Sequence, residues 1–229
     1  MCNFLSILQG KIEKMVEIKV FVFNAFEENT YLLIDDSKSC VIVDPGCYSA
    51  EEQDNLKAYI EKEGLKVVSL VNTHAHLDHV LGNAFVKRTY GVDLLMNEAD
   101  LPVFRGNTIL AENYGFPEYE VVNPDAFLNE GDNIKFGDAV LEVLHVPGHA
   151  PGHIALYDKN NGYCLVGDVL FSGSIGRSDL PGGDYDTLIH SIHTKLFTLG
   201  DKIKIFAGHG PATEIGIEKR SNPFCGINA

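Results

Sequence analysis

The chain has 229 residues, 45% of them hydrophobic and 22% charged, a composition that indicates a globular protein and excludes a disordered or fibrous one. The formal net charge of −14 disfavours non-specific binding to nucleic acid or to an anionic membrane surface. The five cysteines are odd in number and form no C-x-x-C motif, which predicts reduced thiols and a cytoplasmic location.

The first residues of the chain precede any periodic pattern. No apolar run approaches the roughly 20 residues that cross a bilayer, so no membrane partner is expected. The short apolar piece Phe4–Leu8 lacks the basic start and the cleavage site of a signal peptide. We therefore interpret residues 1–14 as an N-terminal extension, with Met1 or Met15 as the true start, and residues 15–229 as one domain.

Strand-like runs alternate with helical segments in the first half of the chain. Ser49 and Glu52 form a capping-box pattern, which predicts a helix that runs to about Lys62 and ends before Gly64. A second helix is expected over His79–Tyr90. Runs rich in β-branched and aromatic residues predict strands at Glu17–Phe23, Thr30–Asp35, Cys40–Gly46, Lys66–His74 and Val92–Asn97.

The second half repeats this pattern after a looser region, Leu101–Glu130, that contains prolines, glycines and aromatic residues. A hairpin turning near Gly137 is expected in Asp132–Val146, and a helix in Asp184–Leu199. Further strands are expected at His153–Asp158, Gly162–Phe171 and Lys202–Gly210. Two strand-rich halves interleaved with helices suggest two sheets packed face to face with helices outside.

Three histidines and an aspartate fall within the six positions from His74 to His79. His74 and His76 are two residues apart at the end of a strand, so their side chains can point the same way. Asp78 and His79 follow where the chain turns. Any one of these residues alone is commonly a hydrogen-bonded or capping residue, but four such groups after an apolar strand favour a site for zinc, iron or manganese.

Further candidate ligands follow other strands. The segment "HVPGHAPGH" offers His145, His149 and His153, but its prolines and glycines exclude a continuous helix, and the tight turn singles out His149. For His145 and His153 we favour a hydrogen-bonding role. Asp168 in "LVGDVLF" and His209 in "AGHG" lie beside glycines that permit close backbone approach.

The motifs "HAHLDH", "PGH", "GD" and "GHG", in this order, resemble those of the metallo-β-lactamase superfamily, which has an αββα sandwich of two mixed β-sheets with outer helices. "LFSGSIGRSDLPGGD" and "RSNPF" are similar to segments of the compact bacterial type II glyoxalase-like hydrolases. The resemblance extends from about Met15 to the end of the chain. It implies two divalent cations, preferably zinc, with iron or manganese as alternatives.

The resemblance also implies a role for each ligand and a reaction. His74, His76 and His149 would hold one cation and Asp78, His79 and His209 the other, with Asp168 bridging them. Cations that share one water lower its pKa and provide a bridging hydroxide, which would attack a small acyl thioester such as S-D-lactoylglutathione. Asp78 would also orient this hydroxide and handle its proton. Asp44 either hydrogen-bonds a ligand histidine from behind or forms a turn before Pro45.

The substrate residues follow less directly from the sequence. Arg177, Arg220 and Asn222 are candidates for contact with an anionic small-molecule substrate, and a surface salt bridge is the alternative for Arg220. Only 19 residues follow Gly210, so a helical C-terminal glutathione-binding domain is not expected. The true β-lactamases of the superfamily typically have a cysteine in the place of Asp168, which disfavours antibiotic hydrolysis. A monomer or a small homo-oligomer is expected.

Two other functions are compatible with the motifs. Persulfide dioxygenases share the fold and a segment that resembles Gly176–Asp179, and they would use one iron held by His74, His149 and Asp168. A non-catalytic metal-binding module that recruits a partner is the third possibility. The complete set of seven candidate ligands favours the dinuclear hydrolase over both.

Overall fold

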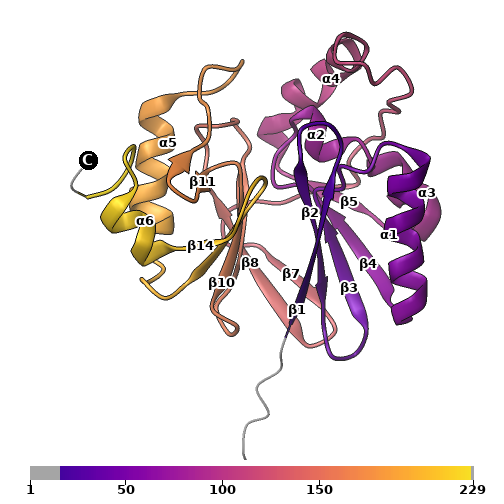
Figure 1. Ribbon diagram of the computed structural model, residues 1–229, viewed down its shortest axis with the longest axis horizontal. Helices are drawn as coiled ribbons and strands as arrows, with labels where there is room; N and C mark the ends of the chain where they lie inside the picture. Colours follow the sequence, from indigo (N-terminus) through magenta and orange to yellow (C-terminus); the bar gives the residue numbers. More distant parts are fainter. Residues whose placement is uncertain (1–15, 228–229) are drawn as a thin grey trace, which may run out of the picture.

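Two mixed β-sheets lie face to face between two layers of helices in the computed structural model, which describes residues 16–227 (Figure 1). The first sheet contains, in spatial order, β1 (Glu17–Phe23), β2 (Glu28–Ile34), β3 (Ser39–Val43), β4 (Lys66–Val71), β5 (Leu94–Met96) and β6 (Ala126–Phe127). The second contains β14 (Thr213–Glu214), β13 (Lys204–Ala207), β10 (Tyr163–Gly167), β9 (Ile154–Asp158), β8 (Ala139–His145) and β7 (Asn133–Phe136). The expected αββα sandwich is confirmed.

The helices cover the outer faces of the two sheets (Figure 1). Those on the first sheet are α1 (Ala50–Glu63) and α3 (Asn83–Tyr90), and those on the second are α5 (Tyr185–Ser191), extended by a π-helical turn at Ile192–Leu196, and α6 (Ile215–Ser221). One end of the sandwich is covered by α2 (Leu77–Val80), a 3₁₀ turn at Glu98–Asp100 and α4 (Leu101–Asn113). A small hairpin, β11 (Leu170–Phe171) and β12 (Ser174–Ile175), follows β10.

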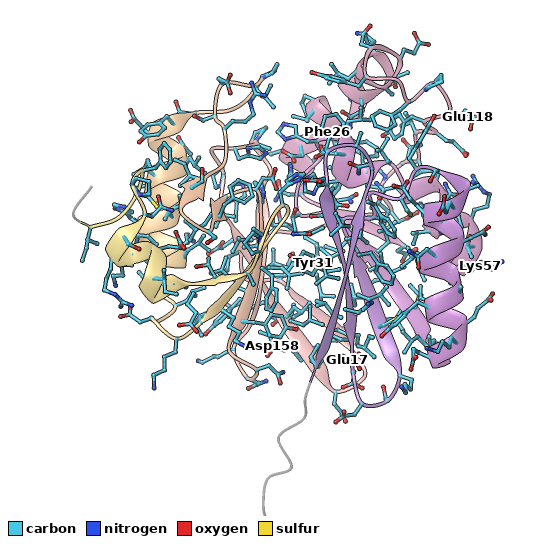
Figure 2. The ribbon with its side chains drawn as sticks, in the orientation of Figure 1. Glu17, Phe26, Tyr31, Lys57, Glu118 and Asp158 are labelled. Carbon is cyan, nitrogen blue, oxygen red and sulfur yellow. The ribbon has the colours of Figure 1, made fainter. Side chains whose placement is uncertain are left out.

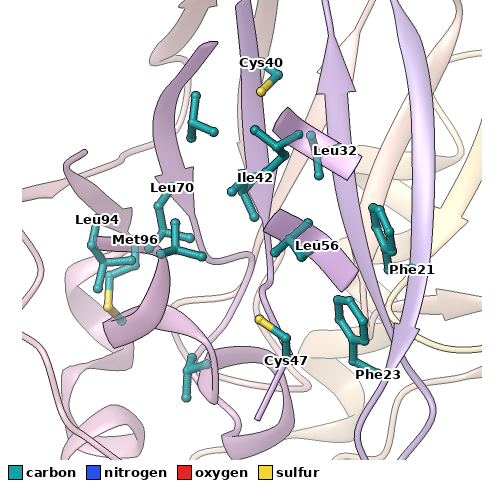
Figure 3. Packing of buried hydrophobic residues seen from close by; sticks show 14 of the residues in the cluster. Phe21, Phe23, Leu32, Cys40, Ile42, Cys47, Leu56, Leu70, Leu94 and Met96 are labelled. Atoms are coloured by element: carbon teal, nitrogen blue, oxygen red, sulfur yellow. The ribbon is translucent and has the colours of Figure 1, made fainter. Parts of the chain in front are cut away.

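Strand alternation produces the layers. Leu32 packs with Leu56 of α1 in the outer core of the first sheet, which Figure 3 shows at close range. The next residue, Leu33, points the other way and packs with Leu141 and Leu156 between the two sheets. Successive side chains of a strand point to opposite faces of the sheet, so they can fill both the core under the helices and the core between the sheets. This requires a strand that is covered on both faces. The continuous apolar runs of the sequence therefore fit these central strands.

The predicted strands and the hairpin at Gly137 are present, with boundaries shifted by a few residues. Two expectations were wrong. The looser region Leu101–Glu130 contains the 13-residue helix α4. The expected helix His79–Tyr90 is split into α2 and α3, because the N–H of Gly82 donates to Pro45 O at 2.7 Å and a Cβ on Gly82 would lie 2.6 Å from Cys47 Sγ. The proposed extension, residues 1–14, lies outside the described residues.

The candidate ligands lie at the α2 end of the sandwich. They follow β4, β8, β10 and β13, whose chain directions bring the segments after them to one edge. Within residues 16–227 no helix combines the length and the apolarity that crossing a bilayer requires. The two sheets therefore serve as a rigid base for loops at a single edge.

The start of α1 connects this helix to the β1–β2 turn. The side chain of Ser49 accepts the N–H of Glu52, and the Glu52 carboxylate accepts the N–H groups of Asn24 at 2.6 Å and of Tyr48 and Ser49 at 2.9 Å each. Burial raises the pKa of Glu52, but these backbone N–H groups lower it more, so the net pKa lies below its usual value.

Replacing Glu52 by Gln removes the charge and one of the two acceptor oxygens, and it should lower the free energy of unfolding at pH 7 by about 1 kcal/mol, the usual net contribution of one hydrogen bond. Because the folded-state pKa is depressed, this stabilisation is present above the unfolded-state pKa and is lost as the pH falls through the folded-state value. Urea unfolding of both proteins between pH 7 and pH 3 should show a difference that shrinks below about pH 4. A difference independent of pH would contradict this account.

Candidate metal centre

Four chain segments converge on the candidate site. His74 and His76 follow β4, and Asp78 and His79 lie in the single turn of α2. The other three residues come from the β8–β9 connection, the end of β10 and the end of β13; they are His149, Asp168 and His209. The structure thus brings together all seven residues that the sequence predicts as ligands, although they span 136 positions from 74 to 209.

Three histidines form the first group. One ring nitrogen from each of His74, His76 and His149 lies within 4.8 Å of the others, and His76 Nδ1 is 2.8 Å from His149 Nε2. His149 Nδ1 donates a hydrogen bond to the carbonyl oxygen of Arg177 at 2.7 Å. The proton of this imidazole is therefore fixed on Nδ1, and the lone pair of Nε2 faces the other two rings.

The second group contains Asp78, His79 and His209, whose ligand atoms also lie within 4.8 Å of one another. His209 Nε2 is 3.1 Å from Asp78 Oδ2, and His209 Nδ1 donates to the carbonyl oxygen of Phe26 at 3.0 Å. His79 Nε2 lies 3.6 Å from Asp78 Oδ2. The two groups are adjacent, since the rings of His74 and His79 have centroids 4.1 Å apart.

Asp168 lies between the two groups. Its Oδ1 is 3.5 Å from His79 Nε2. Its Oδ2 is 3.5 Å from His209 Nε2 and 3.7 Å from His149 Nε2. The carboxylate therefore faces both groups at once, as a bridging ligand must.

Several buried polar atoms at the centre lack a hydrogen-bond partner in the described part of the protein. Among the described residues, His74 Nε2, His79 Nε2 and Asp168 Oδ1 are buried and have no hydrogen-bond partner. Orphaned buried nitrogen and oxygen atoms carry a desolvation cost, and divalent cations are partners that suit imidazole and carboxylate together. The donor set thus fits two divalent cations.

The two groups differ in their electrostatics. Burial lowers the pKa of His74 and His149, and it lowers that of His76 to about 3, so these imidazoles are neutral, the form that binds metals. Burial also acts against a proton on His79, but Asp78 and Asp168 outweigh it and raise the His79 pKa. The negative charge of Asp78 and Asp168 therefore acts on the second group, while the first group consists of neutral imidazoles.

Asp44 supports the centre from behind. Its carboxylate accepts the N–H and the hydroxyl of Thr73 at 2.7 and 2.6 Å, and its Oδ2 lies 3.2 Å from His79 Nδ1. Asp44 also has a φ of 49°, in the left-handed region that is unusual for a residue other than glycine. Of the two roles left open for Asp44, the structure shows the hydrogen bond to a candidate ligand histidine.

His145 and His153 have the hydrogen-bonding roles expected for them. His145 Nε2 donates to Pro151 O at 3.0 Å, and His153 Nε2 accepts the N–H of Asp168 at 3.1 Å.

Sequence reasoning missed Glu28, which is fully buried at the start of β2 with Oε1 3.8 Å from His79 Nδ1. A single acidic residue at the start of an apolar strand gave no signal of this proximity.

The three predicted substrate residues have different surroundings. The carbonyl of Arg177 contacts His149, while its exposed guanidinium pairs with Asp179 at 2.7 and 2.8 Å. Arg220 lies 3.7 Å from Asp201 on the exposed side of α6, which matches the surface salt bridge. Asn222 is buried and its amide binds Ser174 O and Glu218, so it fixes the C-terminal segment. The contacts of Arg220 and Asn222 therefore argue against the predicted substrate role.

An apolar rim, to which the aromatic residues of the connecting region contribute, adjoins the second group. Phe26, at the tip of the β1–β2 turn, is 41% exposed and its ring centroid is 5.8 Å from that of Tyr114, which is 60% exposed (Figure 2). Beneath them, Phe116 is buried against Tyr48. Asn24 holds the turn in place by donating to the carbonyl oxygens of Gly46 and Asp78 at 3.1 and 3.0 Å.

Comparison with known proteins is consistent with this geometry. The model of the metallo-beta-lactamase superfamily matches residues 24–209. The hydroxyacylglutathione hydrolase GloC of Haemophilus influenzae is 43% identical over 211 residues, which are 91% of this chain and 98% of that protein. The chain therefore belongs to the metallo-β-lactamase superfamily.

Solved structures lead to the same family. BLEG-1, a B3 metallo-beta-lactamase, matches with a TM-score of 0.81 and 32% identity over 91% of this chain and 99% of that one. TTHA1623 in a di-iron-bound form matches with a TM-score of 0.80 and 35% identity over 90% and 99%. The expected fold and the expectation of a metal-dependent enzyme of this superfamily are confirmed.

Loading chelator-treated protein with zinc should raise its melting temperature by several degrees, because a ligand at 100 times its Kd stabilises the folded state by about 2.7 kcal/mol. Asp168→Asn should bind fewer cations per chain and show a smaller rise. Differential scanning fluorimetry and elemental analysis measure both effects. Asp201→Asn, which alters an exposed carboxylate paired with Lys219 and Arg220 of α6, is the control and should behave like the unaltered protein. An undiminished rise in Asp168→Asn would contradict the bridging position.

Proposed function

We propose that the protein is a dinuclear metal hydrolase that cleaves a small acyl thioester of the S-D-lactoylglutathione type. The observation that carries this proposal is the position of Asp168, whose oxygens lie 3.5 Å from His79 and 3.5 Å from His209 of the second group and 3.7 Å from His149 of the first. A carboxylate shared by adjacent ligand groups favours two cations over one. The similarity to a protein named hydroxyacylglutathione hydrolase supports the substrate class.

Two divalent cations would be held by the seven predicted ligands, and zinc is the cation we favour, with iron or manganese suited to the same donors. His74, His76 and His149 would hold one cation, Asp78, His79 and His209 would hold the other, and Asp168 would contact both. When bound, such a pair lowers the pKa of water toward neutrality and polarises a carbonyl oxygen.

The protein's own groups orient the ligands and move protons. Arg177 O holds the Nδ1 proton of His149, and Asp44 faces Nδ1 of His79, so in both rings Nε2 points to the centre. Burial opposes ionisation of Asp78, but His79 and His209 together outweigh burial and lower the Asp78 pKa. Asp78 is therefore a carboxylate at neutral pH, and we assign it the role of orienting the nucleophilic water and accepting its proton.

The surroundings of the centre suit a substrate with one charged and one apolar part. The backbone of Arg177 binds His149, and its exposed guanidinium pairs with Asp179. We assign this guanidinium to an anionic group of the substrate, such as a carboxylate of glutathione, which would take the place of Asp179. Phe26 and Tyr114 present exposed rings beside the second ligand group. We therefore place the thiol portion of the substrate toward Arg177 and its acyl group toward the aromatic rings.

The deciding experiment combines metal analysis with activity. Protein purified without added metal is analysed for its elements, loaded with zinc, and assayed with S-D-lactoylglutathione, other acyl thioesters, lactones and esters. We expect two equivalents of cation and thioester hydrolysis that Asp78→Asn lowers by at least about 100-fold. One equivalent of iron with oxygen uptake on glutathione persulfide would instead establish a dioxygenase. Binding of cations without hydrolysis of any compound would leave a non-catalytic module.

Replacing Arg177 by Ala should raise KM for an anionic thioester by about 10-fold, roughly the effect of a lost charge-assisted contact, and change kcat little. The bond that holds His149 comes from the backbone of residue 177, so metal content should not change. Arg88→Ala, which removes an arginine paired with Glu120 on the surface, is the matched control. A fall in kcat with lost metal would show that Arg177 acts on the centre and not on substrate.

We further propose that this is a cytoplasmic enzyme with a small-molecule substrate, acting as a monomer or small homo-oligomer without nucleic-acid or membrane partners. Four cysteines in the described part of the chain, Cys40, Cys47, Cys164 and Cys225, are buried free thiols, as is usual in a reducing compartment. The net charge of −14 acts against binding to polyanions.

A further inference from the structure

Ala75, between His74 and His76, is held by both of its backbone polar groups. Its N–H donates to Asp100 Oδ2 at 2.8 Å, and its carbonyl oxygen accepts from Asn107 Nδ2 at 2.8 Å. Asp100 lies immediately before α4 and Asn107 in its second turn, and both side chains are buried. The helix that packs over the centre therefore fixes the loop that carries the first two candidate ligands.

The same Asp100 carboxylate also holds the loop of the third ligand. Its Oδ1 accepts the N–H of Gly152, three residues after His149. A Cβ at Gly152 would lie 2.5 Å from Asp100 N and 2.9 Å from Asp100 Oδ1, so the two backbones approach closely. The next residue, His153, stacks on His74 with centroids 4.6 Å apart. One carboxylate thus connects the two segments that supply the three-histidine group.

Asp100 has no such link to the second group. Asp78 is held through its carbonyl by Asn24, His79 through Nδ1 by Asp44, and His209 through Nδ1 by Phe26 O. The supports of the two groups meet at Thr73, whose hydroxyl donates to Asp44 Oδ2 and lies 3.1 Å from His74 Nδ1. Within the described residues the hydrogen bonds of the Asp100 side chain, in contrast, go only to the segments that carry the three-histidine group.

We propose that Asp100 is a positioning residue that sets the spacing between the His74–His76 loop and the His149 loop, and that it thereby controls cation binding at the three-histidine group alone. Each loop directs one backbone N–H group at Asp100, and each carboxylate oxygen accepts one of them. An amide at position 100 keeps the shape but offers only one acceptor oxygen and turns an NH₂ donor toward one of the N–H groups. The spacing of the three imidazoles would then no longer be fixed.

The test isolates each ligand group before it alters Asp100. His209→Ala removes a ligand of the second group, and His149→Ala removes one of the first. Zinc affinity is measured by competition with a chromophoric chelator, with and without Asp100→Asn in each background, and cobalt(II) absorption spectra report the ligand geometry. In the His209→Ala background we expect Asp100→Asn to weaken binding by about 10- to 100-fold and to change the spectrum. In the His149→Ala background affinity should stay within about two-fold.

Asp158→Asn is the matched control. Asp158 is also buried and uses both carboxylate oxygens at the opposite end of the sheet (Figure 2). Its Oδ1 accepts the backbone N–H groups of Asn160 and Asn161 at 2.9 Å each, and its Oδ2 accepts the side-chain amide of Asn161 at 2.7 Å. This substitution should lower the melting temperature of the metal-free protein as Asp100→Asn does, yet leave zinc affinity unchanged in both backgrounds. This comparison separates a loss of general stability from a loss of loop spacing.

Three results would overturn the proposal: unchanged affinity in the His209→Ala background, equal weakening in both backgrounds, or equal weakening by Asp158→Asn. If Asp100→Asn does not fold, Asn107→Ala tests the same loop, since it removes the donor to Ala75 O. It should give the same selective weakening with smaller magnitude, and an unselective or absent effect would reject the mechanism. None of these measurements depends on the identity of the substrate.

Discussion

The centre depends on burying ligand atoms that face one another and have no hydrogen-bond partner. His74 Nε2, His79 Nε2 and Asp168 Oδ1 are all removed from water in this way, and such atoms cost free energy unless something replaces the lost hydration. Divalent cations at these positions would compensate that cost. In their absence the remaining structure must hold these side chains together, which explains why so much of one edge of the sandwich is devoted to supporting them.

The support follows one physical pattern. Three candidate ligand histidines each direct Nδ1 to an oxygen of the protein. His149 faces the carbonyl oxygen of Arg177, His79 faces the carboxylate of Asp44, and His209 faces the carbonyl oxygen of Phe26. An imidazole that donates from one nitrogen presents a lone pair at the other, so these contacts decide both the tautomer and the direction of each ring. The acceptors come from a hairpin, a strand end and a tight turn. Their rigidity derives from the two packed sheets below.

Sequence reasoning succeeded where a local pattern carried the information. Ser49 and Glu52 are three residues apart in one helix start, and the capping box is present. It failed for α4, because Pro102 and Gly106 reduce the helical signal although Pro is compatible with a first turn. Asp100 gave no signal because its partners, Ala75 and Gly152, are 25 and 52 residues away and contribute only backbone N–H groups.

The sequence by itself determined the type of ligands, their grouping along the chain and the family, because metal coordination requires particular side chains at spacings that few other sequences share. It also determined the layers, since period-two alternation and apolar runs follow from strand geometry. The position of Asp168 between the two groups was implied by the resemblance, whereas only the tertiary structure decided that the buried Asn222 amide binds Ser174 O and Glu218. It also decided that a helix in the connecting region clamps the ligand loops. Those facts depend on through-space contacts between distant segments, and many of these contacts use main-chain atoms that every residue has.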